Sequence, residues 1–259
     1  MDLNLTGKNA LVCGASSGIG EAVAIELAQL GAKVTLLSRS QDKLSNVQKK
    51  LHNPDYHQIA VVDLSDRCSI VDTLTPLLKK QNIHILINNA GGPKAGPLFE
   101  AGVEEFEIAF RTHILASQTL TQLLVPGMKQ EKYGRIINII STSVKAPIPN
   151  LGVSNTIRGA MANWSKTMAN ELGAFNITVN NVLPGFTQTE RLEKLKDAAS
   201  QRLGKTKDEV EKMWKDCIPM GRLAESFEVA NAVCFLASPA ASYINGINVP
   251  VDGGRTPTL

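Results

Sequence analysis

The sequence predicts an α/β fold built on a doubly wound parallel sheet of about seven strands, with helices on both faces. Two observations lead to this prediction. Short β-branched or leucine-rich runs alternate with longer stretches of helical periodicity, which is typical of βαβ units. The strand runs are also continuously apolar, as in Ile-Leu-Ile-Asn at 85–88 and Ile-Ile-Asn-Ile-Ile at 136–140. Such strands are buried on both faces, as in parallel sheets with right-handed crossovers.

The expected strands and helices alternate along most of the chain. Short apolar runs predict strands at Ala10–Cys13, Lys33–Leu37, Ile59–Val62, His84–Ile87, Arg135–Ile140, Thr178–Val182 and Ile247–Val249. Apolar residues at helical spacing predict helices at Ile19–Gln29, Gln41–Leu51, Ser69–Lys80, Val103–Gln130, Val153–Gly173 and Ser226–Ala237. No Pro/Gly/Ser-rich linker and no internal repeat interrupts this order, so residues 1–259 are expected to form a single domain.

The composition excludes several classes of protein. The chain has 259 residues, of which 43% are hydrophobic and 20% charged, so it is neither disordered nor of low complexity. Its 27 basic and 24 acidic residues give a net charge of +3, which is too balanced to indicate binding to nucleic acid or to an anionic membrane. No apolar run approaches the roughly 18 residues of a membrane-spanning helix.

The cysteines and the first residues bear on the cellular compartment. The four cysteines show no Cys-x-x-Cys spacing, and together with the four histidines they form no metal-ligand cluster, so no metal site is expected. The first residues, Met-Asp-Leu-Asn-Leu-Thr, lack the basic region and the apolar core of a signal peptide. We therefore expect reduced thiols and a cytoplasmic protein.

The segment Glu190–Asp216 differs from the rest of the chain because charged residues of both signs dominate it. It holds eight basic and seven acidic residues, so it is not a phosphate-binding patch. Two interpretations remain, an amphipathic insertion that closes over a site or a solvated helix pair. Its position between a strand-end loop and the last βαβ unit favours the first, and we expect residues 187–218 to form a substrate lid.

A glycine-rich loop follows the first expected strand and opens a helix. It reads Gly14-Ala15-Ser16-Ser17-Gly18-Ile19-Gly20. Glycines here permit a tight turn and let the backbone approach a pyrophosphate, while the helix N-terminus offers unpaired N–H groups to the phosphates. Although such loops also serve as plain turns, this one follows the first strand of an alternating pattern. It therefore indicates a dinucleotide site in a Rossmann-type fold.

The second expected strand ends in Ser38-Arg39-Ser40, where a dinucleotide fold reads the adenosine ribose. An acidic residue at this point would accept a hydrogen bond from the ribose 2′-hydroxyl, whereas a basic residue pairs with a 2′-phosphate. Arg39 with its flanking hydroxyls therefore favours NADP(H) over NAD(H). The alternative is an arginine that is simply solvated at a strand end.

Further motifs follow in order, and together they resemble the short-chain dehydrogenase/reductase family, in particular its β-ketoacyl-carrier-protein reductases. The matching motifs span nearly the whole sequence. They are Gly14–Gly20, Val62-Asp63-Leu64, Asn88-Asn89-Ala90-Gly91, Gly134-Arg135-Ile136-Ile137-Asn138-Ile139, Pro184-Gly185 with Thr189, and the tail from Ile218 through Val251-Asp252-Gly253-Gly254. The resemblance implies that residues 1–259 are one dinucleotide-binding catalytic domain.

The resemblance also implies which residues meet the cofactor. Those matching Asp63 and Leu64 lie against the adenine in the family, and the loop from Pro184 to Thr189 meets the nicotinamide carboxamide. The full expected set is Gly14, Ser16, Ser17, Gly18, Ile19, Gly20, Arg39, Ser40, Asp63, Leu64, Asn89, Ala90, Gly91, Arg158, Pro184, Gly185, Thr187 and Thr189.

The catalytic pattern departs from the family at three of its four positions. The family uses an Asn, a Ser and a Tyr-x-x-x-Lys pair on one helix. Ser141 matches the serine, but Ser154 stands at the tyrosine position and Arg158 at the lysine position. Gly159-Ala160-Met161 then continues as the family does, which fixes the register. His113 lies where the helical asparagine is expected, so the implied tetrad is degenerate.

These replacements change the available acid–base chemistry. An aliphatic hydroxyl ionises far above the tyrosine pKa of about 10, so Ser154 cannot serve as the same acid. Arg158 can bind ribose hydroxyls and stabilise an alkoxide, but it is a poor proton donor. Our hypothesis is that His113, with an ordinary pKa near 6.5, or a water that it holds, delivers the proton. The alternative is a histidine that caps a helix kink or fills a hydrogen-bonding position.

The chain offers no evident substitute for the missing tyrosine. Tyr56 and Tyr133 precede their strands, whereas the site of a parallel sheet lies at the carboxyl ends, and Tyr243 lies outside the site helix. Ser141 with His113 would suit a serine hydrolase, but no Gly-x-Ser-x-Gly sequence surrounds Ser141 and no third acid is evident. We reject that interpretation.

Three functions are therefore open. The first is an NADP(H)-dependent oxidoreductase that acts on a carbonyl or secondary alcohol, including a 3-oxoacyl thioester, through an atypical proton relay. The second is a catalytically silent NADP(H)-binding protein with a sensing or scaffold role. The third is a non-redox lyase or isomerase, because fold does not determine function. The resemblance also implies a homotetramer, with a dimer as the alternative, and a small-molecule substrate rather than nucleic acid or a membrane.

Overall fold

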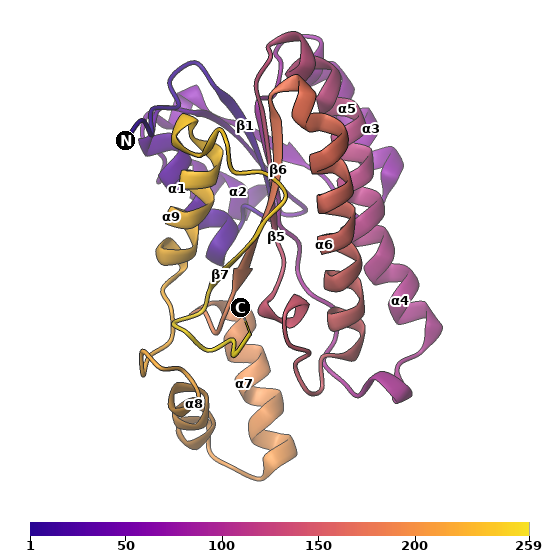
Figure 1. Ribbon diagram of the computed structural model, residues 1–259, viewed down its shortest axis with the longest axis vertical. Coiled ribbons are helices and arrows are strands. Elements are labelled where there is room, and N and C mark those ends of the chain that lie inside the picture. The colour runs from indigo at the N-terminus through magenta and orange to yellow at the C-terminus, as the bar shows by residue number, and fades with distance from the viewer. Residues whose placement is uncertain (259) are drawn as a thin grey trace.

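The computed structural model describes residues 1–258, and its seven strands form one parallel sheet in the order β3-β2-β1-β4-β5-β6-β7 (Figure 1). This confirms the predicted fold class. The strands are β1 (Asn9–Cys13), β2 (Lys33–Ser38), β3 (Gln58–Val61), β4 (Ile85–Asn88), β5 (Gly134–Ile139), β6 (Ile177–Pro184) and β7 (Asn248–Val251).

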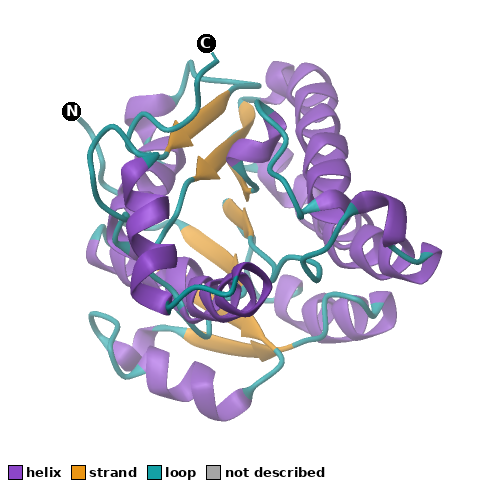
Figure 2. Ribbon diagram, turned by 90° about the horizontal axis from the view of Figure 1, so that it is seen from below, coloured by secondary structure: helices purple, strands orange, loops and turns teal. Residues whose placement is uncertain are grey.

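Helices cover both faces of the sheet, as Figure 2 shows from the end of the strands. Alternate residues of β1 point to opposite faces, so Ala10 and Val12 join one core cluster while Leu11 and Cys13 join the other. The first face carries α1 (Gly18–Gln29), α2 (Gln41–Gln48) and α9 (Ser226–Ala237). The second carries α3 (Arg67–Leu78), α5 (Ala116–Gln130) and α6 (Gly152–Leu172).

The strand order places a topological switch point between β1 and β4. The chain runs outward from β1 to β2 and β3, then returns to the other side of β1 and continues from β4 to β7. The loops that leave β1 and β4 therefore diverge to opposite faces and open a crevice at the carboxyl ends of these strands. Ligands of open α/β sheets bind in this crevice.

The segment expected to be helical over Val103–Gln130 is helical throughout, but it is not one regular α-helix. The structure divides it into α4 (Val103–Phe110), a π-helical turn (Arg111–Leu115) and α5. The turn brings the side chains of His113 and Ile114 into the interior, and the Thr112 hydroxyl donates to the Ile108 carbonyl oxygen at 2.8 Å. Hydrophobic periodicity alone does not reveal such a turn, and π-bulges are frequent at functional sites.

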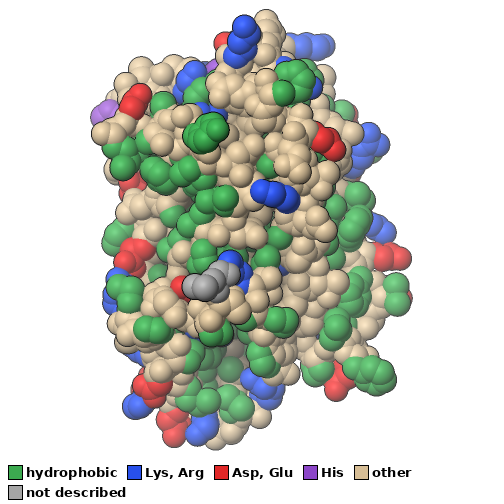
Figure 3. Space-filling view, viewed as in Figure 1, with side chains coloured by type: hydrophobic (Ala, Val, Ile, Leu, Met, Phe, Trp, Pro, Cys, Tyr) green, Lys and Arg blue, Asp and Glu red, His purple; other side chains and the backbone are tan. Residues whose placement is uncertain are grey.

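The charged segment after β6 folds as two helices, α7 (Glu190–Leu203) and α8 (Lys207–Asp216), beyond the carboxyl ends of the strands (Figure 1). Basic and acidic side chains mix at this end of the molecule (Figure 3). Leu192, Ile218 and Leu223 form a small core beneath it with Phe186 and Trp214. The pair therefore has an apolar attachment of its own.

Within residues 1–258, every helix is too short or too polar to span a bilayer.

Candidate active site

The glycine loop between β1 and α1 has the close backbone approach that a dinucleotide requires. Gly14 and Gly18 have φ of 60° and 57°, a region that favours glycine. A Cβ on Gly20 would lie 2.2 Å from the Gly14 carbonyl oxygen. Ser17 begins α1 without a side-chain cap, so the first N–H groups of α1 stay available for an anion. Ser16 and Ile19 belong to the same loop and first helical turn.

The residues expected at the adenosine end lie after β2 and β3. Arg39 is exposed and close enough to Asp63 to help lower its pKa, although the main causes are hydrogen bonds from the backbone and hydroxyl of Ser65. Ser40 begins α2 and accepts from the Lys43 backbone N–H at 3.4 Å. Leu64 does not line the open cleft but a second, smaller pocket, which Arg158 and His113 also line. A positive charge therefore lies where a ribose substituent would be read.

The expected nicotinamide loops meet the glycine loop across the crevice. The Asn89 amide donates to the carbonyl oxygens of Cys13 and Gly14 at 3.3 and 3.4 Å, which ties the loop after β4 to that after β1. A Cβ on Gly18 would lie 3.1 Å from Thr189 Cγ2, so the segment after β6 also faces this loop. The remaining residues of these segments are Ala90, Gly91, Pro184, Gly185 and Thr187.

A cleft of ≈ 910 Å³, open to solvent, is lined by three of the four expected catalytic residues, Ser141, Ser154 and Arg158. The expected cofactor residues that also line it are Ile19, Asn89, Ala90, Pro184, Gly185, Thr187 and Thr189, whereas the loop glycines, Arg39, Ser40 and Asp63 do not. Ser141 follows β5 and accepts from the Ser143 backbone N–H at 3.1 Å. Ser154 and Arg158 lie one turn apart on α6, and both are buried. Thus the structure brings together the residues at the Ser, Tyr and Lys positions of the family pattern.

Arg158 is a buried cation that bridges two strand ends. Its guanidinium donates to the carbonyl oxygens of Ile139 at 2.9 Å and of Ala90 at 3.3 Å, while its Nε has no hydrogen-bond partner among the described residues. Burial lowers the pKa of Arg158 to about 10, and the positive charge of Arg191 adds to this effect. Arg158 therefore stays charged at neutral pH and keeps donors free.

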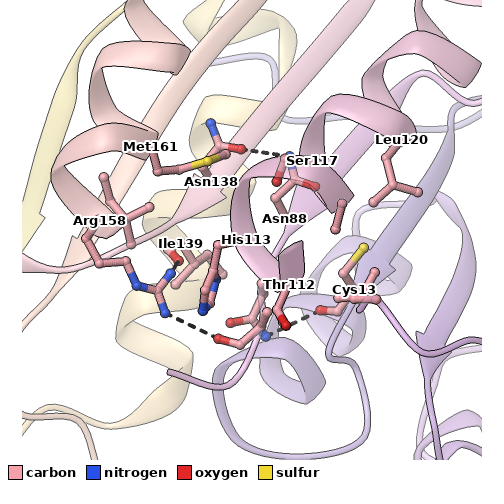
Figure 4. Close-up of a pocket in the computed structure, with 15 residues that line it drawn as sticks. Cys13, Asn88, Thr112, His113, Ser117, Leu120, Asn138, Ile139, Arg158 and Met161 are labelled. Atoms are coloured by element: carbon pink, nitrogen blue, oxygen red, sulfur yellow. Dashed lines mark hydrogen bonds between the residues drawn. The ribbon is translucent and has the colours of Figure 1, made fainter. Parts of the chain in front are cut away.

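His113 lies behind Arg158 rather than in the open cleft. Both residues line a second, smaller pocket, and Figure 4 shows the His113 ring beside the guanidinium. Burial and the charge of Arg158 lower the pKa of His113 from 6.5 to about 3, although a hydrogen bond with the Gly91 backbone opposes them. His113 is therefore neutral at pH 7, and the ordinary pKa on which the proton-relay hypothesis relied does not apply.

A row of asparagines across the sheet was not foreseen from the sequence. Asn88, Asn138, Asn181 and Asn248 pair in register on β4 to β7. Their amides donate in series over 2.7, 3.0 and 2.8 Å, and the Ser165 hydroxyl completes the row. Polar residues inside apolar strand runs were the available signal. Asn88 and Asn138 of this row line the same pocket as His113 and Arg158, so part of the wall of that pocket is polar (Figure 4).

Three further cleft residues were also missed, Phe186, Arg191 and Arg255. The ring of Phe186 stacks on the ring of Trp214 of α8, with 4.8 Å between the centroids. The Arg255 guanidinium also lies over the Phe186 ring, 4.6 Å from its centroid. Arg191 donates to the carbonyl oxygens of Gly92 and Pro93, both at 3.0 Å. The available signal was their closeness in sequence to Thr189 and to the Asp252-Gly253-Gly254 tail.

The tyrosines lie elsewhere, and within the described chain none of them lines either cavity. The Tyr133 hydroxyl donates to the Ala237 carbonyl oxygen at 2.8 Å, just before β5 begins. This agrees with the expectation that Tyr133 lies at the amino end of the sheet, away from the site.

The glycine loop and the switch-point cleft, with the polar residues Ser141, Ser154 and Arg158 that line this cleft, are typical of a nucleotide-dependent oxidoreductase. A family model described as enoyl-(acyl carrier protein) reductase matches residues 14–256. The chain belongs to the short-chain dehydrogenase/reductase family, whose cofactor is NAD(P)(H).

Similar proteins cover the whole chain. It is 34% identical over 258 residues to the 3-oxoacyl-[acyl-carrier-protein] reductase FabG of Pseudomonas aeruginosa, with 97% of this chain and 98% of that protein covered. The structure of L-sorbose reductase from Gluconobacter frateurii, complexed with NADPH and L-sorbose, matches with a TM-score of 0.92, 30% identity and 100% of both chains covered. That of 3-ketoacyl-(acyl-carrier-protein) reductase from Brucella melitensis, complexed with NADH, matches with a TM-score of 0.85, 30% identity, and 98% and 100% covered.

Proposed function

We propose that this protein is an NADP(H)-dependent oxidoreductase that transfers a hydride to or from a carbonyl or secondary alcohol through an atypical proton relay. One observation carries the proposal. The expected cofactor residues after β4 and β6, with Ile19 of the glycine loop, line the same switch-point cleft as the polar trio Ser141, Ser154 and Arg158. The similar proteins include a 3-oxoacyl-[acyl-carrier-protein] reductase and an L-sorbose reductase, so 3-oxoacyl thioesters and ketoses are the first substrates to test.

The residues present fit a dinucleotide phosphate. A Cβ at Gly14 would meet the Asn89 carbonyl oxygen at 2.6 Å, so only glycine fits where the loops after β1 and β4 approach each other. The first turn of α1 has no side-chain cap, which keeps its N–H groups available for a pyrophosphate. Arg39 is exposed at the end of β2 and supplies the charge that a 2′-phosphate requires. The similar structures contain NADPH in one case and NADH in another, which makes Arg39 the deciding feature for this chain.

The chain's own residues divide the chemistry between them. When bound, the nicotinamide would donate or accept the hydride. The hydroxyls of Ser141 and Ser154 would orient the reacting oxygen by hydrogen bonds, and the fixed charge of Arg158 would stabilise the alkoxide that develops on it. In the reductive direction that oxygen must gain one proton. His113, neutral and behind Arg158, would hold a relay water that connects the site to solvent, rather than act as the acid itself.

The helix pair α7 and α8 is proposed to be the substrate lid within residues 187–218. Leu192 and Leu195 of α7 line the cleft, and Trp214 of α8 stacks on Phe186 of the cleft wall. These contacts support a pair of helices that covers the substrate side of the cleft.

A homotetramer of single-domain subunits is proposed from the family resemblance, with a dimer as the alternative. Support comes from exposed apolar side chains on and around α4, which are Phe99, Val103, Ile108, Phe110 and Leu115. Light scattering of the purified protein tests this, and a monomer would contradict it.

A catalytically silent NADP(H)-binding protein is the second candidate. It is favoured by Ser154 at the expected tyrosine position together with the lowered pKa of His113, since no Asp, Glu, His, Cys, Lys or Tyr among the described residues lines the cleft. Two measurements distinguish the candidates. Titration by NADPH fluorescence tests binding, which both require. NADPH oxidation with 3-oxoacyl thioesters, ketoses, quinones and simple ketones tests turnover, which only the first requires.

A further inference from the structure

The open cleft has a strong charge asymmetry. Three arginines line it, Arg158, Arg191 and Arg255, and no aspartate or glutamate of the described chain does so. Within residues 1–258, none of the three forms a salt bridge within 4.0 Å. Guanidinium groups in a cleft normally have a carboxylate or phosphate partner. Here no described carboxylate takes that place, and an anionic ligand could take it.

The expected cofactor accounts for only part of this charge. Its pyrophosphate belongs at the first turn of α1, and Arg39 is assigned to a 2′-phosphate. Arg158 is held by two backbone carbonyl groups next to Ser154 and serves the reacting oxygen. Arg191 and Arg255 remain without an assigned anion.

Arg191 is positioned at the entrance to the cleft from the lid. It lies in the first turn of α7, and two of its N–H donors bond the carbonyl oxygens of Gly92 and Pro93 on the opposite loop. A guanidinium has five donors in a planar fork, so three remain for a ligand. Partial removal from water lowers the pKa of Arg191, and no carboxylate offsets this cost.

Arg255 is positioned by an aromatic stack. Its guanidinium lies 4.6 Å from the centroid of the Phe186 ring, which stacks in turn on Trp214 at an interplanar angle of 11°. This arrangement restrains the side chain over the part of the cleft that Phe186 lines. Five apolar side chains also line the cleft, namely Ile140, Ile148, Leu151, Leu192 and Leu195.

We propose that the substrate is an anion, with a carboxylate or phosphate group that binds Arg191 and Arg255 and a short apolar body between that group and the reacting carbon. This deepens the proposed function and rests on it. Binding of the anion would add a bridge between the lid helix α7, the C-terminal segment and the loop after β4. The reacting end of the substrate would then lie toward Ser154.

Calorimetric titration of the protein saturated with NADP⁺, which cannot reduce the ketone probes, tests this inference with matched pairs of probes. One pair is 4-oxopentanoate and its methyl ester, and the other is dihydroxyacetone phosphate and dihydroxyacetone. We expect at least one anion to bind tenfold or more tightly than its neutral counterpart, since charge-assisted hydrogen bonds to a guanidinium are about twice as strong as neutral ones. Whether the carboxylate or the phosphate member binds identifies the anion.

Three variants locate the effect. Arg191→Gln and Arg255→Gln should each lower the affinity for the anionic probe by about ten- to a hundredfold. Both variants should leave the NADPH dissociation constant within about threefold of wild type. Arg202→Gln is the matched control, because Arg202 is exposed in the last turn of the same helix and does not line the cleft. It should change neither affinity.

The outcomes separate the two proposals. If NADPH itself does not bind, the proposed function fails and this inference fails with it. If NADPH binds but no anion is preferred over its neutral counterpart, only the inference is overturned. It is also overturned if the Arg191 and Arg255 variants weaken NADPH instead of the anion, because the two arginines would then serve the cofactor.

Discussion

The cofactor half of the cleft is made largely of backbone in conformations that glycine permits, whereas the catalytic half is made of side chains whose charges depend on burial. Gly14, Gly18 and Gly20 are the loop positions proposed for a pyrophosphate, and positive φ or close backbone contact favours glycine at each of them. In the proposed catalytic half, Ser154 and Arg158 are the residues expected at the family's Tyr and Lys positions, and burial lowers the pKa of His113 to about 3. Binding and chemistry can therefore change independently in one fold, and each half can be tested alone.

The largest expected effect comes from the catalytic half. Arg158→Met should lower kcat by about 10²–10³, because it removes the fixed charge beside the reacting oxygen. Arg158→Lys keeps a charge at this position and is the matched control, expected within about tenfold of wild type. Steady-state kinetics, with thermal melting to check folding, measures both. Equal activity of the Met variant would remove Arg158 from the chemistry.

Gly20→Ala tests the cofactor half. Its Cβ would overlap the Gly14 carbonyl oxygen, and the resulting shift of the loop should cost about 1–3 kcal/mol, which corresponds to a weakening of NADPH by about ten- to a hundredfold. Gly159→Ala is the control, since a Cβ at this position on α6 meets nothing within 4 Å. Fluorescence titration gives both affinities. Unchanged NADPH binding in Gly20→Ala would show that the loop does not hold the cofactor.

Acid stability sharpens the comparison at His113. Its pKa is about 3 in the folded protein against an ordinary 6.5, so the unfolded chain binds more protons between these values. The contribution is fully present above pH 6.5 and is lost as the pH falls, by about 2 kcal/mol at pH 5. His113→Gln should therefore lose less stability than wild type between pH 7 and pH 5 in denaturant unfolding. Parallel losses in the two proteins would mean that His113 is not buried as a neutral ring.

Arg39 carries the smallest predicted effect. Arg39→Ser should weaken NADPH by about tenfold and leave NADH within about twofold, because only the 2′-phosphate distinguishes the two cofactors. Competitive fluorescence titration compares them. An equal loss of affinity for NADPH and NADH would contradict this prediction, since Arg39 would then be a solvated residue without a role in selecting the cofactor.

The sequence was sufficient for the sheet and the cofactor loops, because both follow local patterns. Apolar runs located all seven strands to within a few residues, and the glycine spacing located the loop after β1. The π-helical turn at His113 was missed, since the helical period continues through it in sequence. The pKa of His113 could not be predicted either, because it depends on burial beside Arg158, 45 positions further along the chain.

Long-range neighbours account for the other omissions. Phe186, Trp214 and Arg255 come from three separate segments and meet only in the folded protein. Arg191 and the carbonyl groups that it bonds are nearly a hundred residues apart in sequence. A single sequence contains the residues of such a cluster but does not show their contacts. The substrate class could therefore not be predicted from the sequence.

Transfer of a deuterium label tests the central claim most directly. The wild-type protein would be incubated with NADPH deuterated at nicotinamide C4 and with the panel of ketones, ketoses and 3-oxoacyl thioesters, and the products analysed by mass spectrometry. The account predicts one deuterium on the carbinol carbon of at least one product, and loss of that product in Arg158→Met. Saturable binding of NADPH without deuterium transfer to any substrate would contradict it and leave a silent cofactor-binding protein.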